Sequence, residues 1–163
     1  NKLKKENNNK EIVSIHLRRG DLTDGTNDIS NNYYGKDGKL SDDSICGNYL
    51  NKALSHFDDD KYIFLLFTGG SREGDDNKKD VSWLKDNLKG SNFFYSGIKT
   101  TLEDFALIKE CDHNIMSHSS SFGWWAAYLN DNPNKKVIAP KDYSMEPDSW
   151  SREGFYPDNF TLI

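Results

Sequence analysis

The chain has 163 residues, enough for one domain with a buried core, and its acidic excess gives a formal net charge of −5. This balance argues against a general nucleic-acid-binding protein, and no apolar run reaches the length of a membrane span. The two cysteines, Cys46 and Cys111, lie in apolar helical patterns, so we expect two separate buried thiols rather than a disulfide or a metal site.

Residues 1–10 are rich in lysine and asparagine, and we expect them to form a disordered lead-in to a single domain over residues 11–163. The first predicted strand begins at residue 12, and four more cover residues 61–68, 93–95, 113–117 and 136–139. Helices are predicted over about residues 42–56, 78–88, 101–111 and 122–130. Residues 20–40 are predicted to be a polar loop that contains Tyr33 and Tyr34, and the tail from Pro140 onward has no period.

The predicted strands alternate with helices and are apolar throughout rather than half polar. This pattern is typical of a parallel sheet that helices cover on both faces. We therefore predict an α/β fold, a Rossmann-like, doubly wound parallel sheet of about five strands with an irregular C-terminal tail.

A cluster of charged residues follows the first predicted strand, where His16, Arg18, Arg19 and Asp21 succeed an apolar run. The carboxyl end of a strand is where ligands bind in open α/β sheets, and the planar fork of arginine matches phosphate oxygens. Strand alternation places His16 and Arg18 on one side and Arg19 toward the other face. A diphosphate site is therefore one interpretation, and a solvated arginine pair bridging nearby aspartates is the other.

A second cluster is the serine triplet at residues 119–121, between a predicted strand and a predicted helix. Free N–H groups at a helix start favour anions, whereas plain N-capping needs only one serine, so the triplet favours anion binding. Asp104 has a simpler alternative, because Thr101 and Asp104 can form a capping pair. Trp124 and Trp125 are expected to be core residues, since adjacent helical positions do not face one pocket.

These motifs together resemble the alpha-1,2-fucosyltransferases, glycosyltransferase family 11. The resemblance is carried, in chain order, by His-Leu-Arg-Arg-Gly-Asp at residues 16–21, Asp104-x-x-Leu107-Ile108-x-x-Cys111, Asn114-Ile115, Ser-Ser-Phe-Gly-Trp-Trp-Ala-Ala-Tyr-Leu at residues 120–129, and Val-Ile-Ala-Pro at residues 137–140. It implies the nucleotide-sugar-binding lobe of a GT-B-like enzyme that binds GDP-fucose and acts without a metal or other cofactor.

The resemblance also implies roles for individual residues. Arg18 matches the arginine that contacts the diphosphate in GDP-fucose-using relatives, and His16, Asp104, Ser121 and Phe122 match residues that line the nucleotide pocket. The candidate site residues are Arg18, His16 and Asp21 as catalytic residues, and His16, Arg18, Arg19, Asp104, Ser120, Ser121 and Phe122 as substrate-binding residues.

Inverting transfer of fucose needs stabilisation of the leaving diphosphate and a route for the acceptor proton. Arg18 and Arg19, with the serine-rich helix start, can supply the first without a metal. Asp58 and Asp60 have the spacing of a metal motif, but they precede their predicted strand and so lie at the opposite end of the sheet. Asp21 and His16 are near the site and are the candidate bases, although a salt bridge to an arginine would make Asp21 a poor one. The alternatives are a base on a missing lobe, or a transfer that needs no base.

The expected function is transfer of L-fucose from GDP-fucose to the 2-hydroxyl of a galactoside, with this chain as the donor-binding half. The expected partners are a galactose-containing glycan acceptor and an acceptor-binding N-terminal lobe that this chain lacks, and no nucleic acid. A non-catalytic nucleotide-sugar-binding module and a transferase of another GDP-deoxyhexose are the alternatives. The family implies the Golgi for a eukaryotic member and the cytoplasm for a bacterial or viral one.

Overall fold

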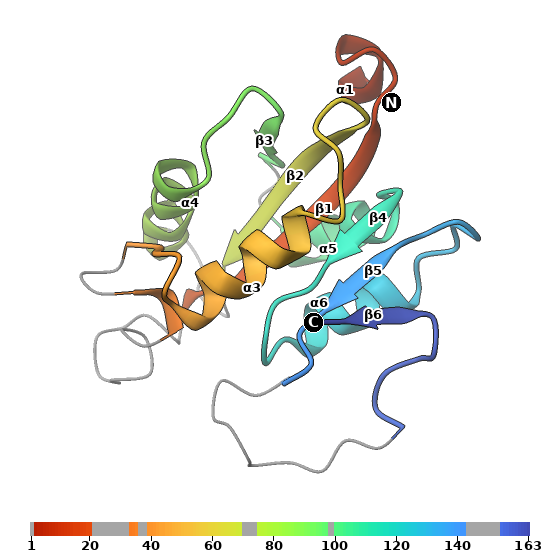
Figure 1. Cartoon of the computed structure of the whole chain (residues 1–163). Coiled ribbons are helices and arrows are strands. Elements are labelled where there is room, and N and C mark those ends of the chain that lie inside the picture. The colour runs from red at the N-terminus through yellow and green to blue at the C-terminus, as the bar shows by residue number, and fades with distance from the viewer. Residues whose placement is uncertain (1, 21–32, 36–38, 70–74, 98–99, 143–153) are drawn as a thin grey trace.

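The computed structural model describes residues 2–20, 33–35, 39–69, 75–97, 100–142 and 154–163. Helices and strands alternate along the described residues as far as β5, which β6 follows directly in the element order, as Figure 1 shows. The helices are α1 (Lys2–Glu6), α3 (Ile45–Leu54), α4 (Asp75–Asn87), α5 (Thr101–Lys109) and α6 (Ser121–Tyr128), and the strands are β1 (Glu11–Arg18), β2 (Tyr62–Gly69), β3 (Phe93–Tyr95), β4 (His113–Ile115), β5 (Val137–Ala139) and β6 (Phe160–Leu162).

The strands of the described residues form one six-stranded sheet, and each pair of neighbours is parallel. Their order is β3-β2-β1-β4-β5-β6. β1 is central, because it pairs with β2 from Glu11 to Arg18 on one side and with β4 on the other. The chain thus builds outward from β1 to β3 and then continues from β4 in the opposite direction. This is the strand order of a doubly wound Rossmann-like sheet, and the predicted fold class is confirmed.

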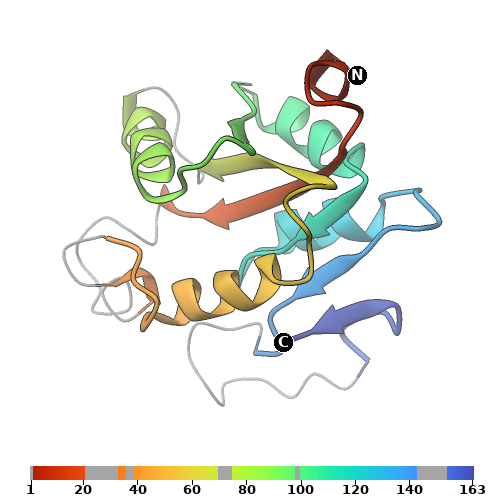
Figure 2. The same cartoon turned by 45° about the horizontal axis from the view of Figure 1, so that its top comes forward.

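Helices cover both faces of the sheet, with α3 and α4 on one face and α5 and α6 on the other (Figures 1 and 2). On the first face, Val13 and Ile15 of β1 pack in one apolar cluster with Leu50 of α3. On the second face, Phe67 of β2 packs with Ala126 of α6. Because apolar side chains are needed on both sides of the sheet, the strand sequences are continuous apolar runs rather than alternations of apolar and polar residues.

A buried amide network joins the central strands to the helices behind them. Asn114 Nδ2 donates to Ser14 Oγ at 2.8 Å and to the carbonyl of Ile108 at 2.9 Å. Asn130 Nδ2 in turn donates to Asn114 Oδ1 at 2.9 Å and to the carbonyl of Cys111 at 2.8 Å. The bonds link β1, β4 and the ends of α5 and α6, so Asn114 fixes how the strands and helices meet.

The two thiols are separate, as predicted. Cys46 and Cys111 are both buried and free. Burial raises the pKa of each thiol to about 12, so both stay protonated at neutral pH and neither is a nucleophile. Among the helices of the described residues, none combines the length and apolar character that crossing a membrane requires.

Two end segments differ from expectation. The lead-in contains α1, and Lys4 Nζ lies 2.6 Å from a carboxylate oxygen of Asp112. The tail contributes β6, whose Phe160 is buried beside β5, so the sheet has one strand more than the five expected. A helix of five residues and a strand of three offer too few positions for a period to show, and tertiary contacts decide their structure.

Tyr33 and Tyr34 also differ from expectation. They lie in a segment whose composition predicts a polar loop, yet each side chain is only 1% exposed. Both rings belong to the apolar cluster between the sheet and α3. The polar residues around them in the sequence did not indicate that Tyr33 and Tyr34 are core residues, since their burial depends on packing between distant segments.

Candidate functional site

The predicted site lies where the strand order reverses. β1 and β4 are neighbours, and the connections after them lead to helices on opposite faces of the sheet. In parallel α/β sheets this switch point, at the carboxyl ends of the strands, is where ligands bind. Arg18 ends β1, and Ser119 follows β4 and precedes α6. The topology thus brings together two motifs that lie 101 positions apart in the sequence.

Arg18 is held at this edge through both its backbone and its side chain. Its N–H donates to Ser117 Oγ at 3.2 Å, and its carbonyl accepts from the Tyr34 hydroxyl. Its guanidinium Nη1 donates to the carbonyl of Ser119 at 2.9 Å. The residue is partly exposed, so its guanidinium can be approached from solvent. A preset, always charged donor group at a switch point suits an anionic ligand.

The serine-rich segment supports this arrangement. Ser119 has a backbone φ of +49°, in the left-handed region, and its carbonyl accepts from Arg18. Ser120 is the N-cap of α6, since its Oγ accepts from the N–H of Gly123 at 3.2 Å. Ser121, the first residue of the helix, is exposed. Ser120 alone therefore caps the helix, as a single serine can. Anion binding by Ser121 stays a prediction.

His16 belongs to β1, and its side chain packs against the start of α6. Its side chain is 7% exposed, its Nδ1 lies 3.4 Å from Ser120 Oγ, and its ring centroid lies 5.3 Å from that of Phe122. A Cβ on Gly123 would come within 3.1 Å of the same Nδ1. Glycine at this position therefore lets the helix approach the imidazole closely.

The environment of His16 disfavours a charged imidazole. Burial first, and the positive charge of Arg18 second, lower its pKa from 6.5 to about 4. A base needs a pKa near the working pH, so His16 is a poor proton acceptor at neutral pH. The other residue considered as a base, Asp21, lies outside the described residues, and its role stays a prediction.

We expect His16 to make the protein sensitive to acid. A histidine whose pKa is lowered by folding stabilises the fold fully above its unfolded pKa, and this stability is lost as the pH falls toward about 4. The loss should reach about 2 kcal/mol at pH 5 relative to pH 7. Denaturant unfolding at both pH values measures it. His16→Gln should remove that part of the pH dependence, whereas the exposed His56→Gln should retain it; equal pH dependence in both variants would contradict the prediction.

Arg19 points to the other face of the sheet, toward α4. It is 7% exposed, and its Nε lies 3.1 Å from Oδ1 of Asp80, which is also buried. Its guanidinium carbon lies 3.7 Å from the ring centroid of Trp83 and 4.9 Å from that of Tyr34. Among the described residues, its Nη1 has no hydrogen-bond partner. These contacts favour a structural role for Arg19, and substrate contact by it stays a prediction.

Asp104 lies in the first turn of α5, which follows β3 at the same edge of the sheet. The predicted capping pair is wrong by one residue, because Thr100 is the N-cap: its Oγ1 accepts from the N–H of Glu103 and donates to the Glu103 carboxylate. Asp104 is therefore not needed for capping. Burial raises its pKa to about 6, against the opposing effect of a hydrogen bond from Ser96. It remains mainly ionised at neutral pH and able to accept hydrogen bonds.

The two tryptophans of α6 have different surroundings. Trp124 is partly buried and stacks on Tyr128, with ring centroids 5.0 Å apart and an interplanar angle of 13°. Trp125 is 50% exposed, so the expectation that both are core residues is wrong for it. Successive residues of an α-helix point about 100° apart, so only one of an adjacent pair faces the sheet.

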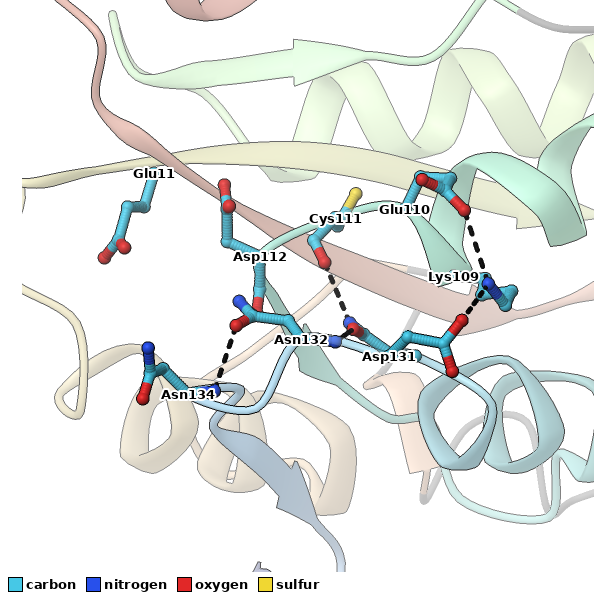
Figure 3. A pocket seen from close by; sticks show the side chains of 9 residues that line it. Glu11, Lys109, Glu110, Cys111, Asp112, Asp131, Asn132 and Asn134 are labelled. Atoms are coloured by element: carbon cyan, nitrogen blue, oxygen red, sulfur yellow. Dashed lines mark hydrogen bonds and ion pairs between the residues drawn. The ribbon is translucent and has the colours of Figure 1, made fainter.

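A polar pocket of about 320 Å³ lies at the opposite, amino end of β4 (Figure 3). It is lined by Glu11, Lys109, Glu110, Cys111, Asp112, Asn130, Asp131, Asn132 and Asn134. Its charges are largely satisfied within the protein, since Lys109 Nζ lies 2.8 Å from an Asp131 oxygen and Lys4 pairs with Asp112. None of the predicted site residues lines it. Within the described ranges, no cluster of three potential metal ligands was found.

With this geometry established, comparison with known proteins gives the family. Residues 1–161 match the profile described as glycosyl transferase family 11. The chain belongs to this family. The match covers the ends of β1 and β4 and the start of α6, so the resemblance noted from the motifs is confirmed.

Individual proteins of known name also align over much of the chain. The Escherichia coli O-antigen biosynthesis glycosyltransferase WbnK is 24% identical over 155 residues, which cover 87% of this chain and 44% of WbnK. Rat galactoside alpha-(1,2)-fucosyltransferase 2 is 29% identical over 155 residues, 90% of this chain and 36% of the relative. Rat galactoside alpha-(1,2)-fucosyltransferase 1 is 32% identical over 124 residues, 72% of this chain and 27% of the relative. The chain spans less than half the length of these relatives, and no solved structure matched.

The structure of this family 11 chain adds residues that sequence reasoning left without a role. Asp80 and Trp83 hold Arg19, Ser117 holds the backbone of Arg18, and Asn114 fixes β4 against β1. Only Asn114 carried a signal, as an amide within a resemblance motif on a predicted strand. The others are ordinary polar and aromatic residues whose partners lie far away in the sequence.

Proposed function

We propose that this chain is the donor-binding half of a galactoside α-1,2-fucosyltransferase and that it binds GDP-fucose at the carboxyl ends of β1 and β4. The main support is the position of Arg18, whose charged guanidinium, a hydrogen-bond donor, is held at the switch point beside the start of α6. Membership of family 11 and the names of the aligned relatives suggest the fucosyl donor and the galactoside acceptor.

In the proposed reaction, the 2-hydroxyl oxygen of the acceptor galactose forms a bond to C1 of fucose. The bond from C1 to the phosphate oxygen breaks on the opposite side, its electron pair leaves with GDP, and the configuration at C1 inverts. Arg18 stabilises the negative charge that develops on the diphosphate, and the N–H groups at the start of α6 add to this effect. These groups supply positive charge, so we propose that the transfer proceeds without a metal ion or another cofactor.

The acceptor proton needs a base, and we place this base outside the described residues because His16 is too weak a proton acceptor. We propose that a galactose-containing glycan is bound largely by a further lobe that precedes this part of the enzyme. This proposal rests on the length of the relatives, of which the chain spans less than half. Within this chain, Asp104 is proposed to read the guanine base.

Calorimetric titration of the chain with GDP and UDP tests the proposed donor. GDP should bind about tenfold or more tightly, because a carboxylate can accept two hydrogen bonds from the adjacent N1–H and N2 amino groups of guanine, whereas uracil offers only its N3–H. The affinity for GDP should be the same with EDTA present. Asp104→Asn should reduce the preference for GDP, whereas the exposed neighbour substitution Glu103→Gln should leave it unchanged. Equal affinities for the two nucleotides, or a large loss of GDP binding in EDTA, would refute the assignment.

A further inference from the structure

Tyr33 and Tyr34 connect the two segments that form the proposed site. Their rings pack edge to face, with centroids 4.6 Å apart and an interplanar angle of 86°. Both side chains are 1% exposed, and burial raises the pKa of each phenol well above its usual value. Their hydroxyl groups therefore remain protonated at neutral pH and can act as hydrogen-bond donors.

Tyr34 contacts the segment that carries Arg18. Its hydroxyl donates to the carbonyl of Arg18, and its ring lies against the guanidinium of Arg19, 4.9 Å from centroid to guanidinium carbon. The ring also packs edge to face on Trp83 of α4, with centroids 5.3 Å apart. Tyr34 thus fixes the peptide between the two arginines against α4, at the point where β1 ends.

Tyr33 contacts the segment that leads into α6. Its hydroxyl oxygen lies 2.9 Å from Nδ1 of His118, and the two rings pack edge to face at 5.2 Å. His118 is 5% exposed and immediately precedes Ser119, whose carbonyl accepts from the Arg18 guanidinium. Adjacent tyrosines therefore contact the segments on both sides of the same Arg18–Ser119 hydrogen bond, Tyr34 through the Arg18 carbonyl and Tyr33 through the His118 side chain.

We propose that the Tyr33–Tyr34 pair is a positioning device that sets the distance and orientation between Arg18 and the first turn of α6. The inference rests on the proposed function, because its consequence is a guanidinium held ready for a diphosphate. Neither tyrosine is proposed to touch the ligand. They act through Arg18, by limiting the conformations that its backbone and the serine segment can adopt.

Single-oxygen substitutions test this proposal. Tyr33→Phe and Tyr34→Phe keep the rings in place, and each should weaken GDP binding roughly three- to tenfold, the effect of losing one hydrogen bond of ordinary strength. Tyr49→Phe is the matched control, since its hydroxyl is also buried and donates to a backbone carbonyl, that of Ile138, at 3.1 Å. It should lower the melting temperature similarly and leave the GDP affinity within about twofold of the parent.

Two further measurements separate positioning from general loosening. If Tyr34 acts through Arg18, adding Tyr34→Phe to Arg18→Lys should cost no further GDP affinity. In the nucleotide-free protein, amide hydrogen exchange at Arg18 should accelerate in Tyr33→Phe and Tyr34→Phe but not in Tyr49→Phe. Unchanged exchange in the first two, or an equal loss of GDP affinity in Tyr49→Phe, would overturn the proposal. Failure of the parent chain to bind GDP would instead refute the proposed function, and the exchange result would still decide the positioning role.

Discussion

Arg19→Ala is expected to destabilise the protein by about 3–5 kcal/mol, the usual cost of breaking a buried ion pair from one side. The substitution leaves the Asp80 carboxylate without its partner at a position that is 4% exposed. It also removes the guanidinium that stacks on Trp83. Guanidinium chloride unfolding, followed by tryptophan fluorescence or circular dichroism, measures the change.

Matched variants identify the source of this loss. Arg19→Lys keeps a charge near Asp80 but lacks the planar group that stacks on Trp83, so it should recover only part of the stability. Lys89→Ala breaks an exposed pair with Asp86, 3.9 Å apart, and should change the stability little. An Arg19→Ala protein as stable as the parent would show that the pair with Asp80 does not support the fold.

Arg18→Ala is expected to weaken GDP binding by about 1.5–3 kcal/mol, which is roughly 10- to 150-fold, through loss of charge-assisted contacts with the diphosphate. Its melting temperature should change little, because the residue is partly exposed and its backbone bonds to Ser117 and Tyr34 survive the substitution. Arg18→Lys should recover little affinity, since a point charge does not replace a two-point fork. GDP titration beside thermal melts tests both variants.

A cation at the other end of the sheet is the control for a general charge effect. Lys4→Ala removes one positive charge paired with Asp112 and should leave the GDP affinity unchanged. The opposite pattern for the two arginines would contradict the geometry. If Arg19→Ala abolished GDP binding while Arg18→Ala retained it with an unchanged melt, the diphosphate contact would belong to Arg19.

The different directions of the Arg18 and Arg19 side chains were predictable from sequence, because they follow from a backbone rule. Successive side chains of a strand point to opposite faces, and the apolar run before them identifies the strand. Arg18 accordingly reaches Ser119 near α6, and Arg19 reaches Asp80 on α4. The parallel sheet was predictable for a similar reason, since continuous apolar strands indicate cover on both faces.

Features that depend on long-range packing were not predictable. Tyr33 and Tyr34 are buried by contacts with α3, α4 and the segment after β4, none of which their polar neighbours reveal. The lowered pKa of His16 arises from burial beneath α6. The cap of α5 at Thr100 instead of Thr101 is a smaller error, since two adjacent threonines compete and only the final backbone geometry selects one.

The central position of β1 has a consequence for synthesis of the protein. β1 can pair with β2 soon after both are made, but its other edge pairs with β4, in a register where Val13 lies opposite His113. On the ribosome, that edge stays open until about a hundred further residues have emerged, and Arg18 meets Ser119 only then. An unpaired apolar strand edge invites association with other chains. Between the synthesis of β1 and that of β4, the nascent chain is therefore exposed to aggregation, before the site assembles.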